Sequence, residues 1–300
     1  MKNFYHRGFS GCCDLLDDVS KERDMRLGAF LAKDAFARPK VRTMTAEQLY
    51  QFDLNGYVVV PAAIDSSHLR RLLVYWSEHL TGNRLHDVNF DWGEEWRALI
   101  DLETVFPFLD EVFRSRFRLD HMFCVDERFV SSGGRLHHQA DMFDEGIYYW
   151  VRNQRVHSGL VAVQYVLSDV TEAQSHFCCI PGSHRANFPV PGCYREVEGN
   201  PMLRHLFLRA GDVLIFSEAL VHGTYVVPSS GPRRSVFARY MNNHSYFRKP
   251  SDQRPIHALP ATPNHAASAT PAFRVDRLTP RQYQLVVEPA YARGHAAIGG

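Results

Sequence analysis

The residue types that could carry chemistry gather in two short stretches of the chain. The first, residues 135–141 (RLHHQAD), contains the adjacent histidines His137 and His138, and the second, residues 219–224, contains His222. Two neutral imidazoles and one oxygen ligand on one face of a metal make a non-haem Fe(II) site, whose other face stays open for a cosubstrate and O2. The sequence therefore predicts an iron site made by His222 and one histidine of the pair.

The carboxylate that such a site needs is missing from its usual place. On a β-strand the motif reads His-x-Asp, because residues two apart point to the same face. Gln139 stands two residues after His137, Ala140 stands two after His138, and Asp141 is one step out of register. The occupant of the third ligand position is therefore the main question that the sequence raises.

An arginine pair downstream suits a dicarboxylic cosubstrate. A molecule such as 2-oxoglutarate would chelate iron through its keto-acid end and needs a cation for its far carboxylate, which a bidentate guanidinium binds well. Arg233 and Arg234 begin a predicted strand after His222. Because side chains alternate along a strand, one of the two arginines must face inward.

Helices with clear ends precede these residues. The pattern Thr45-x-x-Gln48 has the form of a capping box that starts a helix, Gly56 ends that helix, and residues 57–60 read as a short buried strand. Leucines and a tryptophan at helical spacing predict a second helix over residues 69–80. This opening is mainly helical.

From about residue 119 the pattern changes to short strands separated by Gly, Pro, Ser and Asn. The predicted strands are residues 122–125, the region around His137, and residues 159–167, 213–216 and 235–240. Regularly spaced short strands after a helical opening favour a mainly β fold with flanking helices, a double-sheet β-barrel or jelly roll. Residues 81–117 and 186–208 are expected to be loops that shape a substrate pocket.

Composition excludes several classes of function. The chain has 300 residues, 45% of them hydrophobic, and a net charge of +1 without a lysine-rich block, so we expect one globular core and no nucleic-acid partner. The longest apolar runs are shorter than the roughly 20 residues that span a bilayer, and the amino terminus shows no export signal. We therefore expect a cytoplasmic protein without a membrane partner. No His-Glu-x-x-His motif or zinc-knuckle spacing is present, which argues against a zinc hydrolase.

Five segments between residues 45 and 245 form an ordered set. They are residues 45–61, Pro181-Gly182-Ser183-His184, residues 211–216, His222-Gly223-Thr224 and Arg233-Arg234-Ser235. In this order and spacing they resemble the phytanoyl-CoA dioxygenase (PhyH-like) family of Fe(II)- and 2-oxoglutarate-dependent oxygenases. The resemblance implies a double-stranded β-helix of the cupin-like kind. It also implies that His222 is the distal iron ligand, that Arg233 anchors 2-oxoglutarate and that Thr224 donates a hydroxyl hydrogen bond to the same carboxylate.

The resemblance also suggests where the domain lies. Residues 1–44 are expected to be an amino-terminal extension, residues 45–245 the oxygenase domain, and residues 246–300 a segment that wraps around the same globule. A short last helix is expected from Thr279.

The chain departs from the family at the proximal motif. Hydroxylating members read His-x-Asp, whereas residues 138–140 read His-Gln-Ala, similar to the aliphatic halogenases of the same fold. With a methyl group at Ala140 in place of a carboxylate, a coordination position opens for chloride. Arg239, which lies six residues after Arg233 on the same strand face, matches an arginine that supports the halide site in such halogenases.

Three other interpretations of the missing acid stay open. His137 could be the ligand, with Gln139 in the carboxylate position and still no acid there. Asp141 could reach the metal if the strand bulges. Glu218, four residues before His222, could supply the oxygen ligand from the end of a neighbouring strand.

Together these features predict an enzyme that oxidises an unactivated C–H bond of a small molecule with Fe(II), 2-oxoglutarate and O2. Chlorination at an open halide position is the favoured outcome, and the alternatives are hydroxylation with a relocated carboxylate and a non-catalytic, metal-binding jelly roll. The substrate could be a free metabolite, a nucleotide or a carrier-tethered acyl group.

Overall fold

In the computed structural model of the chain, the first described helix begins and ends where the sequence predicts. At the start of α2 (Ala46–Asn55), the Thr45 hydroxyl accepts the Gln48 N–H at 3.1 Å, and the Gln48 side chain accepts the Thr45 N–H at 3.0 Å. Gly56 ends the helix with a φ of 81°, a left-handed conformation that glycine adopts without steric cost. The strand β1 (Tyr57–Val60) follows directly, so both predictions are confirmed.

The structure describes residues 44–80, 85–114, 116–126, 135–138, 147–227, 231, 233–243, 245, 247 and 277–286, which belong to a compact unit, residues 42–300. The other helices are α3 (Ser66–His79), α4 (Glu94–Arg97), α5 (Phe106–Phe113) and α6 (Pro280–Val286), with 3-10 turns η2 (Phe90–Trp92), η3 (Ala98–Asp101), η6 (Ser183–Arg185) and η7 (Gly192–Tyr194). The other strands are β2 (Leu85–Asp87), β3 (Phe117–Asp126), β4 (Tyr149–Arg152), β5 (Arg155–Ser158), β6 (Leu160–Val166), β7 (His176–Cys179), β8 (Arg204–Leu206), β9 (Val213–Ser217), β10 (His222–Tyr225) and β11 (Arg234–Asn242).

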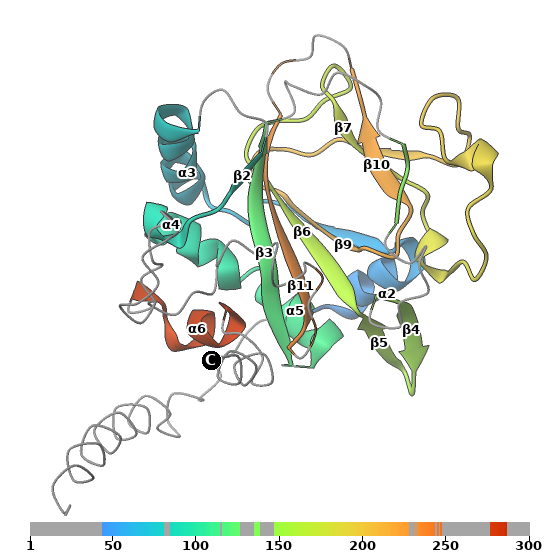
Figure 1. The fold of residues 1–300 in the computed structure, drawn as a ribbon, viewed down its shortest axis with the longest axis horizontal. Coiled ribbons are helices and arrows are strands. Elements are labelled where there is room, and N and C mark those ends of the chain that lie inside the picture. The colour runs from blue at the N-terminus through green and yellow to red at the C-terminus, as the bar shows by residue number, and fades with distance from the viewer. Residues whose placement is uncertain are drawn as a thin grey trace, which may run out of the picture. The chain divides into compact units, whose positions relative to one another are not determined.

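Antiparallel sheets dominate this unit (Figure 1). Within the described residues, one six-stranded sheet has the order β1-β9-β6-β11-β3-β2, a three-stranded sheet has the order β10-β7-β8, and β4 pairs with β5 in a hairpin. His137 extends the three-stranded sheet through an antiparallel bridge to His222. The predicted mainly β fold with flanking helices, a double-stranded β-helix, is confirmed.

The two faces of the six-stranded sheet pack against different partners. One hydrophobic cluster joins β1, β6 and β9 to Phe177 and Cys179 of β7, so it lies between the two sheets. The larger cluster packs the other face against the helices, and Figure 1 shows α3, α4 and α6 on that side of β3. On β11, Ala238 faces the helices and Phe237 faces the other sheet. Alternation therefore directs Arg233 and Arg239 inward, between the sheets.

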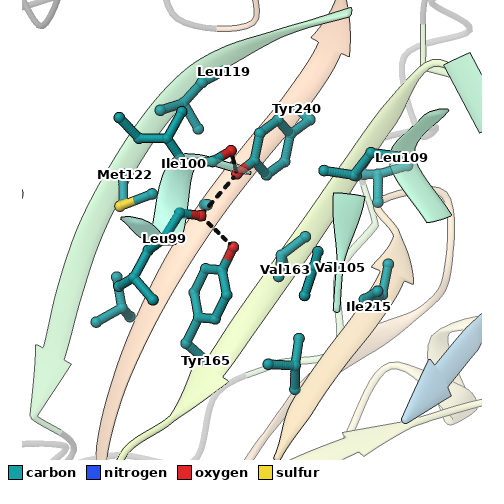
Figure 2. Close-up of a cluster of buried hydrophobic side chains, with 14 of the residues drawn as sticks. Leu99, Ile100, Val105, Leu109, Leu119, Met122, Val163, Tyr165, Ile215 and Tyr240 are labelled. Atoms are coloured by element: carbon teal, nitrogen blue, oxygen red, sulfur yellow. Dashed lines mark hydrogen bonds between the residues drawn. The ribbon is translucent and has the colours of Figure 1, made fainter. Parts of the chain in front are cut away.

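The segment expected to form a pocket loop, residues 81–117, instead builds the core on the helical side. Tyr165 donates its hydroxyl hydrogen to the Leu99 carbonyl at 2.6 Å, and Tyr240 donates to the Ile100 carbonyl at 2.8 Å (Figure 2). The loop prediction is wrong for residues 85–113, which form β2, η2, α4, η3 and α5, and most apolar side chains of residues 88–113 pack in the core cluster on this face of the sheet. These residues support the sheet from the side opposite the predicted iron site.

Several other predictions concern residues that the structure does not describe. Ala140, Asp141, residues 1–43 of the expected amino-terminal extension and residues 248–276 of the expected carboxy-terminal segment lie outside the described residues. The helix expected from Thr279 is present as α6. No helix in the described ranges has the length and apolarity that a membrane crossing requires.

Replacing Gly56 with alanine is expected to lower the free energy of unfolding by about 1–3 kcal/mol. The residue combines a positive φ with tight packing, since an added Cβ would stand 2.6 Å from Nδ1 of His184 and 2.9 Å from Cδ1 of Leu220. Urea unfolding measures the loss. Gly192→Ala is the control, because nothing lies within 4 Å of its added Cβ, and its effect should stay within about 0.5 kcal/mol. Equal stability of the two variants would contradict this view of Gly56.

Candidate metal centre

His137 and His222 lie side by side on paired segments. The His137 N–H donates to the His222 carbonyl at 2.9 Å, and the His222 N–H donates to the His137 carbonyl at 2.9 Å. Directly opposed residues in an antiparallel pair present their side chains on the same face, and here the two ring centroids are 4.5 Å apart. His138 is the next residue along, so alternation directs its side chain to the other side of the segment.

Both imidazoles are oriented by backbone carbonyls. Nδ1 of His222 lies 2.7 Å from the Leu220 carbonyl oxygen, and Nδ1 of His137 lies 3.3 Å from the Arg135 carbonyl oxygen. A carbonyl only accepts, so Nδ1 carries the proton in each ring and Nε2 keeps its lone pair, the arrangement of a metal-binding histidine. Burial lowers the pKa of His222 to about 4, although the charge of Glu218 opposes this. His222 is therefore neutral at pH 7.

Glu218 adds an ionised carboxylate to this pair. The side chain is fully buried, and its Oε1 accepts a hydrogen bond from Nε of Arg239 at 2.7 Å. Its Oε2 lies 3.9 Å from Nε2 of His222 and accepts no hydrogen bond from the described residues. Burial raises the pKa of Glu218, but the neighbouring basic groups, first Arg239 and then His222 and His137, together outweigh this and hold the pKa below its usual range. One carboxylate oxygen thus remains available to a cation.

The donor set of His137, His222 and Glu218 suits an Fe(II) ion, which takes two imidazoles and one carboxylate. Within the part of the chain that the structure describes, no three His, Cys, Asp or Glu side chains are already gathered closely enough to hold a metal. Neighbouring ligands of an octahedral ion with bonds of about 2.1 Å stand roughly 3 Å apart. Binding would therefore have to draw the His222 and Glu218 side chains together.

The residues predicted to bind 2-oxoglutarate border the same space between the sheets. Arg233 precedes β11 and is 2% exposed. Burial raises the pKa of Cys178 on β7 to about 12, although the charge of Arg233 acts against that shift. Thr224 lies two residues after His222 on β10, on the same face and opposite Phe177. Their roles stay predictions.

Arg239, which is predicted to support a halide, donates a hydrogen bond from Nε to the Glu218 carboxylate. Its side chain is 19% exposed and lies over the rings of Phe123 and Phe247, each 5.6 Å away. The sequence interpretation missed one partner of Arg239, the buried His121, whose Nε2 lies 3.2 Å from Nη1 of Arg239. The available signal was the charged pattern Arg-x-Asp-His over residues 118–121, which is followed by the apolar run of residues 122–125.

Tyr149 and Trp150, which follow the proximal motif along the chain, differ in their burial. Tyr149 is buried, packs edge-on against His184 with ring centroids 4.4 Å apart, and donates a hydrogen bond to the Asp53 carboxylate. Arg185 pairs with the same carboxylate. Trp150 is 45% exposed. Tyr149 is therefore a core residue, and His184 joins α2 to the η6 turn through the Asp53 carbonyl.

A comparison with protein families identifies the family to which the chain belongs. The model for the phytanoyl-CoA dioxygenase (PhyH) family matches residues 72–235. The chain belongs to the phytanoyl-CoA dioxygenase family. It is therefore a member of the non-haem Fe(II)- and 2-oxoglutarate-dependent oxygenases, and the prediction of an enzyme of that class is confirmed.

Solved structures share the fold of this PhyH-family chain. HygX from Streptomyces hygroscopicus, with nickel and 2-oxoglutarate bound, is 24% identical with a TM-score of 0.61, covering 69% of this chain and 90% of that chain. The epimerase SnoN from nogalamycin biosynthesis is 20% identical with a TM-score of 0.51, covering 72% of this chain and 87% of its own. The carbocyclase SnoK from the same biosynthesis is 17% identical with a TM-score of 0.52, covering 69% and 88%. No curated protein sequence matches the chain.

Proposed function

We propose that this PhyH-family enzyme oxidises a C–H bond of a small molecule, with Fe(II) held by His137, His222 and Glu218. The observation that carries the proposal is the buried Glu218 Oε2, which lies 3.9 Å from Nε2 of His222 and has no hydrogen-bond donor among the described residues. A buried carboxylate oxygen is costly to leave unmatched, and a cation between the acid and the two imidazoles would match it. Glu218 would then replace the carboxylate that the proximal motif lacks.

Iron and 2-oxoglutarate, when bound, would activate O2, which is the oxidant, because oxidation of the cosubstrate to succinate and CO2 supplies two of the electrons that O2 takes up. The protein's own residues bind and orient. In His137 and His222, Nδ1 donates to a backbone carbonyl, which holds each ring so that Nε2 can bind the iron. Arg233 offers a bidentate fork to the far carboxylate of 2-oxoglutarate, and Thr224 offers a hydroxyl.

A free natural product is the substrate class that we favour. HygX has been solved with nickel, 2-oxoglutarate and hygromycin B, and SnoN with Fe3+, α-ketoglutarate and nogalamycin RO. By analogy of fold, we propose that this chain also binds iron, 2-oxoglutarate and a small organic substrate, and that the substrate enters between the sheets. Half-buried Phe123 and Phe237, stacked with centroids 5.5 Å apart on the inner face, offer an apolar wall for its carbon skeleton.

Halogenation is the second candidate, favoured by Ala140 in the motif of residues 138–140. Two contacts speak against it. Arg239, the cation that would support a halide, is paired with Glu218 at 2.7 Å. The second oxygen of that carboxylate lies beside His222, where its negative charge would repel chloride.

An anaerobic titration with Fe(II) and 2-oxoglutarate, with and without chloride, tests the proposal. We expect a visible absorption band from iron and 2-oxoglutarate bound together, unchanged by chloride. Glu218→Gln, which keeps size and removes charge, should weaken Fe(II) binding by about 100-fold or more, because it alters a proposed ligand and loss of an outer partner alone costs about 10–100-fold. A band that shifts with chloride, and loses that shift in Ala140→Asp, would instead establish the halide position. No band at any concentration would favour a non-catalytic jelly roll.

A further inference from the structure

We propose that Asp120 and His121 are positioning residues that hold Arg239 and, through it, aim Glu218 at the metal. This inference rests on the proposed function, because it takes Glu218 as the oxygen ligand. It concerns a buried chain of polar side chains that runs from β3 to the candidate metal centre.

A β-bulge brings the two residues to the same face. In the pairing of β3 with β11, His121 stands opposite Arg239 while Leu119 stands opposite Tyr240, so Asp120 is the extra residue. A bulge turns consecutive side chains away from strict alternation. Asp120 and His121 are each 1% exposed and touch one another, with Oδ2 of Asp120 2.7 Å from Nδ1 of His121.

The direction of each hydrogen bond follows from chemistry. A guanidinium has only donors, so Nη1 of Arg239 donates to Nε2 of His121 at 3.2 Å. His121 must therefore carry its proton on Nδ1, where it donates to Asp120. The other oxygen of Asp120 accepts from Nη1 of Arg118 at 2.9 Å and from the Phe247 N–H at 3.1 Å. Asp120 thus selects the one tautomer of His121 that can accept from Arg239.

Aromatic rings fix the guanidinium further. Phe123 and Phe247 lie 5.6 Å from the Arg239 guanidinium carbon, within the range of cation–π attraction. The ring of His121 is stacked on Phe123, with centroids 5.6 Å apart and planes 14° apart. Held in this way, Arg239 presents Nε to Oε1 of Glu218 and leaves Oε2 toward His222.

Substitution of Asp120 with asparagine tests whether Asp120 sets the tautomer of His121, and it changes the side-chain volume little. An amide nitrogen can donate to Nδ1 of His121, and the imidazole proton then moves to Nε2, where it faces the donors of Arg239. Arg239 loses its acceptor, and the direction of Glu218 is no longer fixed. Loss of such outer partners typically lowers metal affinity about 10–100-fold.

The experiment is a Co(II) titration of the full-length protein, followed by the visible ligand-field spectrum, which reports ligand geometry independently of turnover. We expect Asp120→Asn and His121→Leu to raise the Kd for Co(II) by about 10–100-fold and to change the spectrum. His121→Gln, whose amide oxygen can accept from Arg239, should restore part of both. Asp126→Asn is the matched control, since Asp126 is a buried acid on the same strand that pairs with Arg234, and it should bind as the unaltered protein does.

The outcomes separate this inference from the proposed function. If Glu218→Gln weakens Co(II) binding while Asp120→Asn and His121→Leu leave the Kd and spectrum unchanged, the positioning role is overturned and the ligand role of Glu218 stands. If Glu218→Gln also binds Co(II) normally, the proposed function fails. Should Asp120→Asn not fold, the comparison of His121→Leu with His121→Gln decides, and equal affinities and spectra in that pair would overturn the inference.

Discussion

His222→Ala is expected to lose Fe(II) binding and 2-oxoglutarate turnover almost completely. The ring is packed among Phe177 and Phe216, with centroids 5.6 Å and 4.7 Å away, and its Nε2 lies 3.9 Å from Oε2 of Glu218. Removal of one of three protein ligands should reduce metal affinity by more than the roughly 10–100-fold that outer partners contribute. Iron content after dialysis and succinate production measure the two losses.

The histidine pair supplies a matched control for this result. His137→Ala should behave like His222→Ala, because the two rings face the same space, whereas His138→Ala should keep both iron and turnover. Circular dichroism of each variant checks that the sheet remains folded. If His138→Ala is inactive and His137→Ala is active, His138 and not His137 binds the metal.

Arg233→Leu is expected to weaken 2-oxoglutarate binding by roughly 30-fold or more, because loss of one partner of a buried charge pair costs about 2–5 kcal/mol. The side chain is 2% exposed and alternation directs it between the sheets. Its loss should raise the KM for 2-oxoglutarate, while the affinity for Fe(II) without cosubstrate should change little. The KM and a direct metal titration separate these two effects.

Arg234→Leu is the control for this second result. Arg234 is the neighbouring arginine, its side chain is 25% exposed, and its Nε lies 3.8 Å from the Asp126 carboxylate. Its replacement should leave the KM for 2-oxoglutarate nearly unchanged. A larger rise of KM in Arg234→Leu than in Arg233→Leu would reverse the assignment of the two arginines.

Features whose partners lie close in the chain could be predicted from the sequence. Three features are of this kind: the capping box of Thr45 and Gln48, the left-handed turn at Gly56, and the alternation that directs Arg239 of β11, and Arg233 just before it, to the same side. Each depends on residues only a few positions apart, so short-range geometry is enough. The family pattern added the order of the segments, and with it the barrel and the position of His222.

The tertiary structure decided what the local pattern left open. Strand pairing places His137 beside His222, because the antiparallel bridge to β10 joins these two residues. The position of Glu218 follows from the path of the chain after β9, and the approach of His121 to Arg239 follows from a bulge in β3. These contacts join residues far apart in sequence, and a register shift of one residue would turn each side chain to the other face. Sequence periodicity carries no information about which distant strands pair or where a bulge falls, so the acid beside the histidines became visible only in the folded protein.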